Sequence, residues 1–338
     1  MHPFEMTRAL IDMESITENE KQVGEFLLRY LSGLAAGSGG RAEAMPVTSE
    51  RFNVYAEWGR PVVVLSTHMD TVPPFIASSE DEEYIHGRGA CDAKGIIAAM
   101  VAAAEKLLEN GTRNFGLLFV VGEERNSAGA DVASRSPHGS RYLIDGEPTE
   151  SRVALGSKGI LRYEIVATGK MAHSAYPELG ESAIEKLLDA LNAIRRMQLP
   201  EDPVLGRTTV NIGTISGGRA PNIVPDAAKA ELAIRIVGDG CKIDQVLREA
   251  VGARAEVRKI LTLPAMHFAS LDGFPTSVVS FTTDIPVLAP AWGEPFLFGP
   301  GSIQVAHTKD EKISKRELLD AVDTYAQMTR MLLSRAEA

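Results

Sequence analysis

Cysteine is scarce in this sequence: Cys91 and Cys241 are the only two among 338 residues, and they lie far apart. Two cysteines allow one disulfide at most, and this usage favours a reduced chain in the cytoplasm. A secretory signal is also missing, because the N-terminal segment MHPFEMTRALIDMES has no basic start followed by a long apolar run. We therefore expect a cytoplasmic protein.

Long hydrophobic runs and an excess of basic residues are absent as well. No apolar stretch approaches the roughly 20 residues that span a bilayer, so no membrane partner is expected. Lys and Arg number 35 against 45 acidic residues, and the net charge of −10 argues against a nucleic-acid-binding protein. An anionic substrate stays compatible with this charge, since one arginine can bind it locally.

A glycine fingerprint for nucleotides is missing too. The segment Gly87-Arg-Gly89-Ala-Cys-Asp92 follows the G-x-G-x-x-G pattern only as far as its second glycine, and no Walker sequence is present. A nicotinamide-dependent oxidoreductase would suit the α/β pattern described next, but it would need that fingerprint.

The composition and length are those of a soluble globular protein with room for two domains. Apolar segments at 61–65, 115–121 and 142–144 predict buried strands, and residues 95–110 predict a helix that ends before Gly111. This alternation indicates an α/β domain with a mostly parallel sheet and helices on both faces. A capping box is expected at residues 17–20, where Thr17 and Glu20 precede apolar residues at helical spacing.

The pattern changes near residue 160. Strands are expected at 161–168, 207–215, 228–237 and 255–261, and helices at 181–197 and 243–251. Their order, βαββαβ, is that of ferredoxin-like domains. A last helix from Ser314 to about Ser334 returns to the first pattern. We therefore expect a catalytic domain made of residues 1–159 and 265–338, with residues 160–264 inserted into it.

Most chemically reactive side chains directly follow the predicted strands. His68 and Asp70 follow the first strand, Glu123 and Glu124 the second, and Glu147 the third. Sites in open α/β sheets lie at the carboxyl ends of strands, so these side chains should gather at one edge.

Two histidines and three carboxylates form a ligand set suited to a pair of zinc ions. They are His68, Asp92, Glu124, Glu147 and His307. Asp92 has two oxygens and can hold two cations about 3.5–4 Å apart, although a helix cap is its ordinary interpretation. Taken alone, His307 would more simply be a buried histidine that caps the final helix.

The adjacent acids Glu123 and Glu124 are the sharpest local signal. They repel each other unless a cation is near, although a surface turn is the ordinary interpretation. Glu124 then serves as ligand and Glu123 as general base for a metal-bound water.

Two aspartates, Asp70 and Asp145, lie close in sequence to the candidate ligands. Asp70 points the same way as His68 on an extended strand, so it can accept a hydrogen bond from the second imidazole nitrogen. The residues alone leave open whether Asp145 or Glu147 is the fifth ligand.

Seven segments recur here in the order of a known family: STHMDTVP, GRGACDAKG, the GEE pair, GEPT, AHSAYPELGESAI, GGRAPNIVP, and FGPG followed by AHTKDE. Over nearly its whole length the sequence resembles the co-catalytic zinc hydrolases. These include acetylornithine deacetylase, succinyl-diaminopimelate desuccinylase, aminoacylase and the glutamate-releasing carboxypeptidases. The resemblance implies two zinc ions per chain, replaceable by Co²⁺ or Mn²⁺, with Asp92 bridging them. It also favours Glu147 over Asp145 and implies a cis peptide after Asp92.

The same resemblance assigns the inserted domain to a lid that also forms a homodimer. His173 and Asn222 would contact the substrate oxyanion, with His173 supplied by the partner subunit. Arg235 and the loop from Gly299 to Gly301 would bind the substrate carboxylate.

We therefore expect a two-zinc hydrolase that cleaves the amide bond of an N-acyl amino acid. The alternative is a di- or tripeptidase or carboxypeptidase on the same scaffold, acting on a short peptide. A silent metal- or amino-acid-binding module is a third possibility, which the intact Glu123 disfavours.

Overall fold

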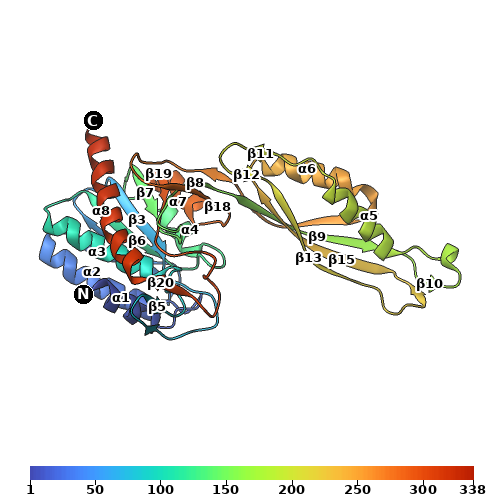
Figure 1. The fold of residues 1–338 in the computed structure, drawn as a ribbon, viewed down its shortest axis with the longest axis horizontal. Helices are drawn as coiled ribbons and strands as arrows, with labels where there is room; N and C mark the ends of the chain where they lie inside the picture. The colour runs from blue at the N-terminus through green and yellow to red at the C-terminus, as the bar shows by residue number, and fades with distance from the viewer. The chain divides into compact units, whose positions relative to one another are not determined.

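The structure is a computed structural model that describes residues 1–338, and the chain forms two compact units (Figure 1). Unit 1 contains Met1–Leu155, Phe268–Ser277 and Thr283–Ala338, and unit 2 contains Gly156–His267 and Val278–Thr282. A segment in the middle of the chain thus folds separately from the segments on either side of it.

The large sheet of unit 1 has four parallel strands at its centre. They are, in spatial order, β6 (Phe115–Val120), β3 (Val63–His68), β7 (Tyr142–Asp145) and β19 (Glu294–Leu297). Antiparallel strands extend the sheet beyond β6 with β2 (Phe52–Trp58) and β1 (Arg41–Pro46), and beyond β19 with β8 (Val153–Ser157). Two short strands, β17 (Met266–His267) and β18 (Thr276–Val279), pair with β8. The parallel centre agrees with the sequence pattern, whereas the antiparallel edges were not predicted.

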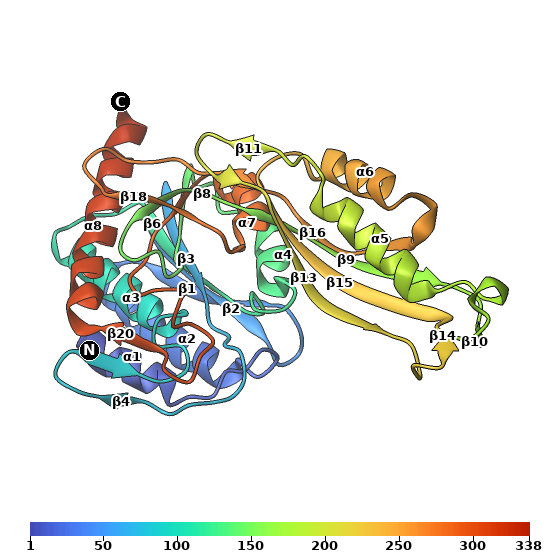
Figure 2. The same cartoon turned by 45° about the vertical axis from the view of Figure 1, so that its right-hand side comes forward.

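Helices cover both faces of this sheet, as expected. One face carries α1 (Pro3–Ile11), α2 (Lys21–Ser38), α3 (Lys94–Glu109) and α8 (Lys315–Glu337), and the other carries α4 (Ala128–Ser134) and α7 (Ile285–Trp292). Alternation along β3 directs Val63 and Leu65 into the first core and Val64 into the second. Figure 2 shows α3 and α8 side by side. No helix of the structure has the length and apolar character needed to cross a membrane.

A small sheet joins two segments that are distant in sequence. Its order is β20 (Lys312–Ser314), β5 (Tyr84–His86), β4 (Ser79–Glu80), and all its pairs are antiparallel. It brings the residues just before α8 beside the residues just before α3.

The predicted capping box is wrong, although the predicted helix is present. The N-cap of α2 is Glu20, and its side chain makes no cap hydrogen bond. The Glu20 carboxylate instead accepts two hydrogen bonds from Arg51, at 2.8 and 2.6 Å, within the core. The Thr17 hydroxyl donates to Asp70, at 2.8 Å. Both side chains have stronger partners, distant in sequence, than the helix end offers.

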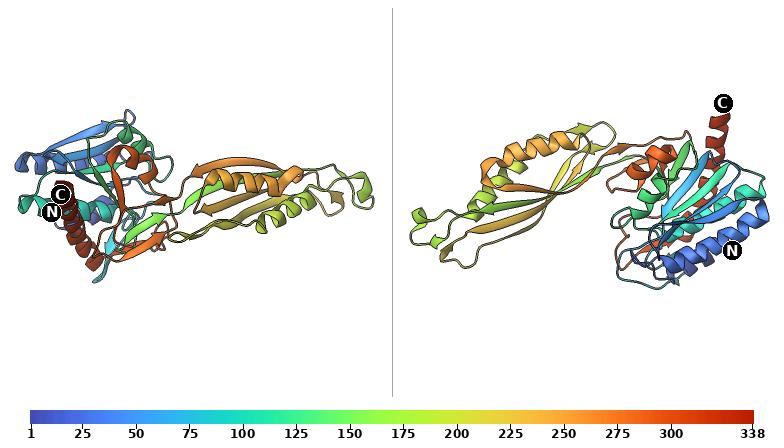
Figure 3. Two further views of the ribbon diagram at one scale, coloured as in Figure 1. Left: turned by 90° about the horizontal axis from the view of Figure 1, so that it is seen from above. Right: turned by 180° about the vertical axis from the view of Figure 1, so that it is seen from behind.

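Unit 2 has the βαββαβ order expected from the sequence. The strands β9 (Gly159–Thr168), β13 (Thr209–Gly217), β15 (Ala227–Ile236) and β16 (Glu256–Leu263) form an antiparallel sheet in the order β13-β15-β9-β16. The helices α5 (Ala183–Arg195) and α6 (Gly240–Val251) cover one face of it (Figure 3). Smaller elements are β10 (Ala172–His173) paired with β14 (Ile223–Val224), β11 (Glu201–Asp202) paired with β12 (Gly206–Arg207), and two 3₁₀ turns at Pro177–Leu179 and Gly252–Arg254.

Candidate metal centre

The parallel strands end at one edge of the sheet, and the candidate side chains begin there. His68 is the last residue of β3. Glu123 and Glu124 follow the end of β6, and Glu147 follows the end of β7. Strand direction alone therefore brings together residues from three separate segments.

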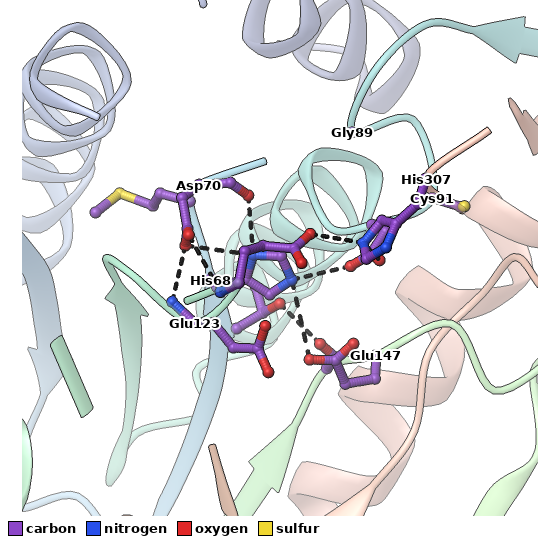
Figure 4. A network of polar contacts seen from close by, with 12 residues as sticks. His68, Asp70, Gly89, Cys91, Glu123, Glu147 and His307 are labelled. Atoms are coloured by element: carbon purple, nitrogen blue, oxygen red, sulfur yellow. Dashed lines mark hydrogen bonds and ion pairs between the residues drawn. The ribbon is translucent and has the colours of Figure 1, made fainter. Parts of the chain in front are cut away.

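The carboxylate of Asp92 lies between two histidines, His68 and His307, both of which Figure 4 labels. Its Oδ1 is 2.9 Å from Nε2 of His68, and its Oδ2 is 3.2 Å from Nε2 of His307. Glu124 Oε1 lies 2.8 Å from the same His307 nitrogen, and Glu147 Oε1 lies 3.9 Å from the His68 nitrogen. Oδ1 of Asp92 thus lies near His68 together with Glu147, and Oδ2 lies near His307 together with Glu124. A carboxylate that bridges two cations would be arranged in this way.

Two groups of possible metal ligands result, and both include His68. The first also contains Asp92 and Glu124, and the second also contains Glu123 and Glu147, with all donor atoms of a group within 4.8 Å of one another. Ligands at tetrahedral positions about 2.1 Å from a zinc ion stand roughly 3.4 Å apart, so this spacing suits such an ion.

The electrostatics of the site also fit cations. Burial raises the pKa of Glu147 well above its ordinary value, and the charges of Glu123 and Asp92 raise it further. Hydrogen bonds to Asp92 and Glu124 raise the pKa of His307 to about 10. Four carboxylates surround two histidines here, and buried negative charge of this kind is stabilised by bound cations.

Asp145 lies outside both ligand groups. It ends β7 and is buried, and burial together with the neighbouring Asp284 raises its pKa well above the ordinary range of an aspartate. Asp284, which the sequence did not single out, has a buried carboxylate without a hydrogen-bond partner. Glu147 therefore shares a ligand group with His68, and Asp145 does not.

The turn that carries Asp92 does not use it as a helix cap. The N-cap of α3 is Ala93, with no side-chain cap hydrogen bond, so the carboxylate of Asp92 remains directed at the two histidines. The peptide between Asp92 and Ala93 is cis, as the family resemblance implied.

The second nitrogen of His68 has a different partner from the expected one. Nδ1 lies 2.9 Å from the backbone carbonyl oxygen of Asp70 and 3.6 Å from its carboxylate Oδ1. A carbonyl oxygen can only accept a hydrogen bond, so Nδ1 carries a proton, which leaves Nε2, the nitrogen beside Asp92, as the one that can bind a metal.

The carboxylate of Asp70 holds the loop of the two glutamates. Its Oδ1 accepts hydrogen bonds from the backbone N–H groups of Gly122 (2.9 Å) and Glu123 (3.1 Å), and its Oδ2 accepts from that of Glu124 (3.2 Å). The Thr17 hydroxyl donates to the same Oδ2. Burial would raise the pKa of Asp70, but its hydrogen bonds lower it below the ordinary value. Asp70 therefore positions Glu123 and Glu124 through their backbone.

The glycines of the 299–301 loop, to which the family resemblance gives a role in binding substrate, are packed closely against neighbouring segments. A Cβ on Gly299 would lie 2.4 Å from the carbonyl oxygen of Glu147, and Gly301 has a φ of +85°. The N–H groups of Gly299 and Gly301 already donate to Thr149 Oγ1 and Glu317 Oε2. The role of this loop in binding a substrate carboxylate therefore stays a prediction of the family resemblance.

Unit 2 contains the other three candidates, His173, Asn222 and Arg235. His173 and Asn222 are exposed neighbours, because β10 pairs with β14 and the N–H of Ser174 donates to the carbonyl oxygen of Asn222 at 3.0 Å. The N–H of Ala175 donates to Nδ1 of His173, at 3.1 Å. Arg235 lies apart from this pair, half-buried on β15, and burial alone lowers its pKa, without any contribution from an acidic partner.

The profile of peptidase family M20/M25/M40 matches residues 64–331. The chain belongs to this family. A peptidase M20 domain-containing protein of Schizosaccharomyces pombe is 38% identical over 333 residues, which cover 95% of this chain and 82% of that protein. A probable carboxypeptidase of Aspergillus oryzae is 37% identical over 377 residues, which cover 97% of this chain and 87% of that protein.

Solved structures share the fold of this M20 protein. A tripeptidase from Staphylococcus aureus has a TM-score of 0.81 at 22% identity, over 98% of both chains. The YXEP protein of Bacillus subtilis, described as a dinuclear metal binding peptidase from the M20 family, has a TM-score of 0.71 at 15% identity, again over 98% of both chains. The chain is thus a hydrolase of amide or peptide bonds in a metal-dependent family, which confirms the resemblance seen in the sequence.

Proposed function

We propose that this protein is a two-zinc peptidase that releases a terminal residue from a short peptide. The observation that carries the proposal is the carboxylate of Asp92 between His68 and His307, with Glu124 and Glu147 beside them. N-acyl amino acid cleavage was the first expectation from the sequence. Relatives described as probable carboxypeptidases favour the peptidase alternative over it.

In this proposal the five ligands are His68, Asp92, Glu124, Glu147 and His307. The bound cations would polarise the scissile carbonyl and lower the pKa of a water molecule. Asp92 would hold both cations, because its two oxygens face different histidines. Co²⁺ or Mn²⁺ would suit the same nitrogen and oxygen donors.

Glu123 is the proposed general base and acid. Its backbone N–H is held by Asp70, and its carboxylate lies with His68 and Glu147 in one ligand group. From there it can accept a proton from the attacking water and later donate it to the leaving amine. Burial raises its pKa well above that of an ordinary glutamate, which moves it toward the range useful for proton transfer at neutral pH.

Unit 2 is proposed to supply the contacts to the substrate. Nδ1 of His173 accepts a hydrogen bond from Ala175, so the ring proton resides on Nε2, which can donate to an oxyanion. Asn222 is next to it and offers an amide donor. No acidic side chain contributes to the pKa of Arg235, so its guanidinium is available to pair with a substrate carboxylate. We also propose that unit 2 forms a homodimer, as the family resemblance implies.

A substrate panel on metal-loaded protein tests this function. We expect turnover of dipeptides and tripeptides with a free C-terminus to exceed that of N-acetyl and N-succinyl amino acids. Chelation should abolish the activity, and Zn²⁺ or Co²⁺ should restore it, with metal content approaching two equivalents per chain. Preference for the N-acyl substrates would return the assignment to the deacylase, and full activity after rigorous removal of metal would refute the metallopeptidase.

The variant Arg235→Lys tests how the substrate carboxylate is bound. An ammonium group cannot form the paired hydrogen bonds of a guanidinium, so we expect a KM about tenfold or more higher for peptides with a free carboxylate. C-terminally amidated peptides should be poor substrates of the wild type and change little in the variant. Equal losses on free and amidated peptides would mean that Arg235 acts only in the fold of unit 2.

A further inference from the structure

Glu311 lies buried at the centre of a network between the two segments that carry Asp92 and His307. It is four residues after His307, and only 2% of its surface is exposed. The AHTKDE segment contains it, but the proposed function gives it no role. A buried carboxylate needs several hydrogen bonds or a cation to offset its loss of hydration.

One oxygen of Glu311 gathers the backbone of the turn before α3. Oε1 accepts hydrogen bonds from the N–H groups of Gly89 (2.9 Å), Cys91 (3.4 Å) and Asp92 (3.3 Å). Figure 4 includes this turn through Gly89 and Cys91, beside His307. Three donors in one short turn can converge on one acceptor only when the turn keeps a single shape.

The other oxygen of Glu311 binds a buried arginine, Arg88, which in turn contacts the segment that carries His307. Oε2 forms an ion pair with Nη1 of Arg88, whose side chain is also 2% exposed. The same Nη1 donates to the carbonyl oxygen of Thr308, at 3.2 Å, and the N–H of Gly87 donates to the carbonyl oxygen of Glu311, at 3.1 Å. The residue next to His307 is thereby tied to the turn that carries Asp92.

We propose that Glu311 is a positioning residue that sets the distance between Asp92 and His307 and so shapes the cation site. The inference rests on the proposed function, because it assigns Asp92 and His307 as ligands. The carboxylate of Glu311 contacts the backbone behind the ligands and does not point into the cation site. Groups that orient ligands in this way typically contribute about 10–100-fold to metal affinity.

Two substitutions of Glu311 test separately the charge of its carboxylate and the position of that carboxylate. Glu311→Gln keeps the shape but turns an NH₂ donor toward either Arg88 or the backbone N–H groups. Glu311→Asp keeps the charge but withdraws it by one carbon–carbon bond, about 1.5 Å, from its donors. Asp310→Asn is the matched control, since it removes the same charge from the adjacent, exposed residue.

Co²⁺ titration of the full-length protein tests the proposal, read by the affinity and by the visible absorption of the bound ion. We expect both Glu311 variants to bind Co²⁺ about 10–100-fold more weakly than wild type, with altered absorption bands, and Asp310→Asn to match wild type. Circular dichroism of the cation-free proteins establishes that each variant is folded, and Glu311→Asp carries the test if Glu311→Gln is not. Wild-type affinity and spectrum in folded Glu311→Asp overturn the inference alone. A wild-type protein that binds no Co²⁺ overturns the proposed function as well.

Discussion

Glu123→Gln is expected to lower kcat by roughly 10²-fold or more while leaving the bound metal in place, because general acid–base catalysis contributes about 10²–10⁴-fold. The amide has nearly the shape of the carboxylate but cannot accept the proton of the attacking water. The backbone N–H of Glu123 would still be held by Asp70, so the loop should keep its shape. The measurements are steady-state kinetics on a peptide substrate and elemental analysis of the same sample.

Glu124→Gln is the matched comparison, since the same chemical change is made one residue along. Glu124 Oε1 lies 2.8 Å from His307 Nε2 in the proposed ligand set, so this variant should lose metal as well as rate. Excess Zn²⁺ in the assay should recover part of the activity of Glu124→Gln and none of that of Glu123→Gln. If Glu123→Gln turned over at the wild-type rate, another group would have to be the base.

Asp92→Ala is expected to have the largest effect on cation binding. The substitution removes both oxygens that face His68 and His307, so each cation would lose a ligand at once. Partners outside the ligand shell already contribute about 10–100-fold to affinity, and a shared ligand should contribute more than about 100-fold. Isothermal titration with Zn²⁺ should therefore show weak binding, and peptide hydrolysis should be lost.

The control for Asp92→Ala must show that the turn before α3 still forms. The backbone N–H of Asp92 donates to Glu311, and this hydrogen bond does not depend on the side chain. We expect cation-free Asp92→Ala to be folded by circular dichroism. Zn²⁺ binding with wild-type stoichiometry and affinity in this variant would show that Asp92 is not the bridging ligand.

The sequence was sufficient to predict the central architecture of the protein. Apolar runs identified β3, β6 and β7, the Ala-rich segment identified α3, and the later alternation identified the βαββαβ order of unit 2. Each of the three strands contains a continuous apolar run, and α3 consists largely of strong helix formers, so local pattern and tertiary burial agree. The antiparallel strands β1 and β2 and the helices α1 and α7 were not predicted: both strands contain polar residues among the apolar ones, and α7 contains two prolines.

Three of the candidate ligands, His68, Glu124 and Glu147, could be expected together, because parallel strands bring their carboxyl ends to one edge of the sheet. Tertiary structure decided the hydrogen-bond partners of several residues around the site. Thr17 and Glu20 suggested a helix cap locally, but Asp70 and Arg51 bind them in the folded chain. The N–H groups of Gly299 and Gly301 donate to Thr149 and Glu317, and no local pattern indicated these partners.

The residue types and their order along the chain thus determined the family, the fold class and the set of candidate ligands. Only the tertiary structure showed that Asp70 binds the loop of the glutamates and that Glu311 joins the segments of Asp92 and His307. The sequence was sufficient for the candidate ligands because a ligand is recognised by its side-chain chemistry, which the residue type gives directly. The groups that position those ligands act through hydrogen bonds to the backbone of distant segments, and such contacts have no local pattern in the sequence.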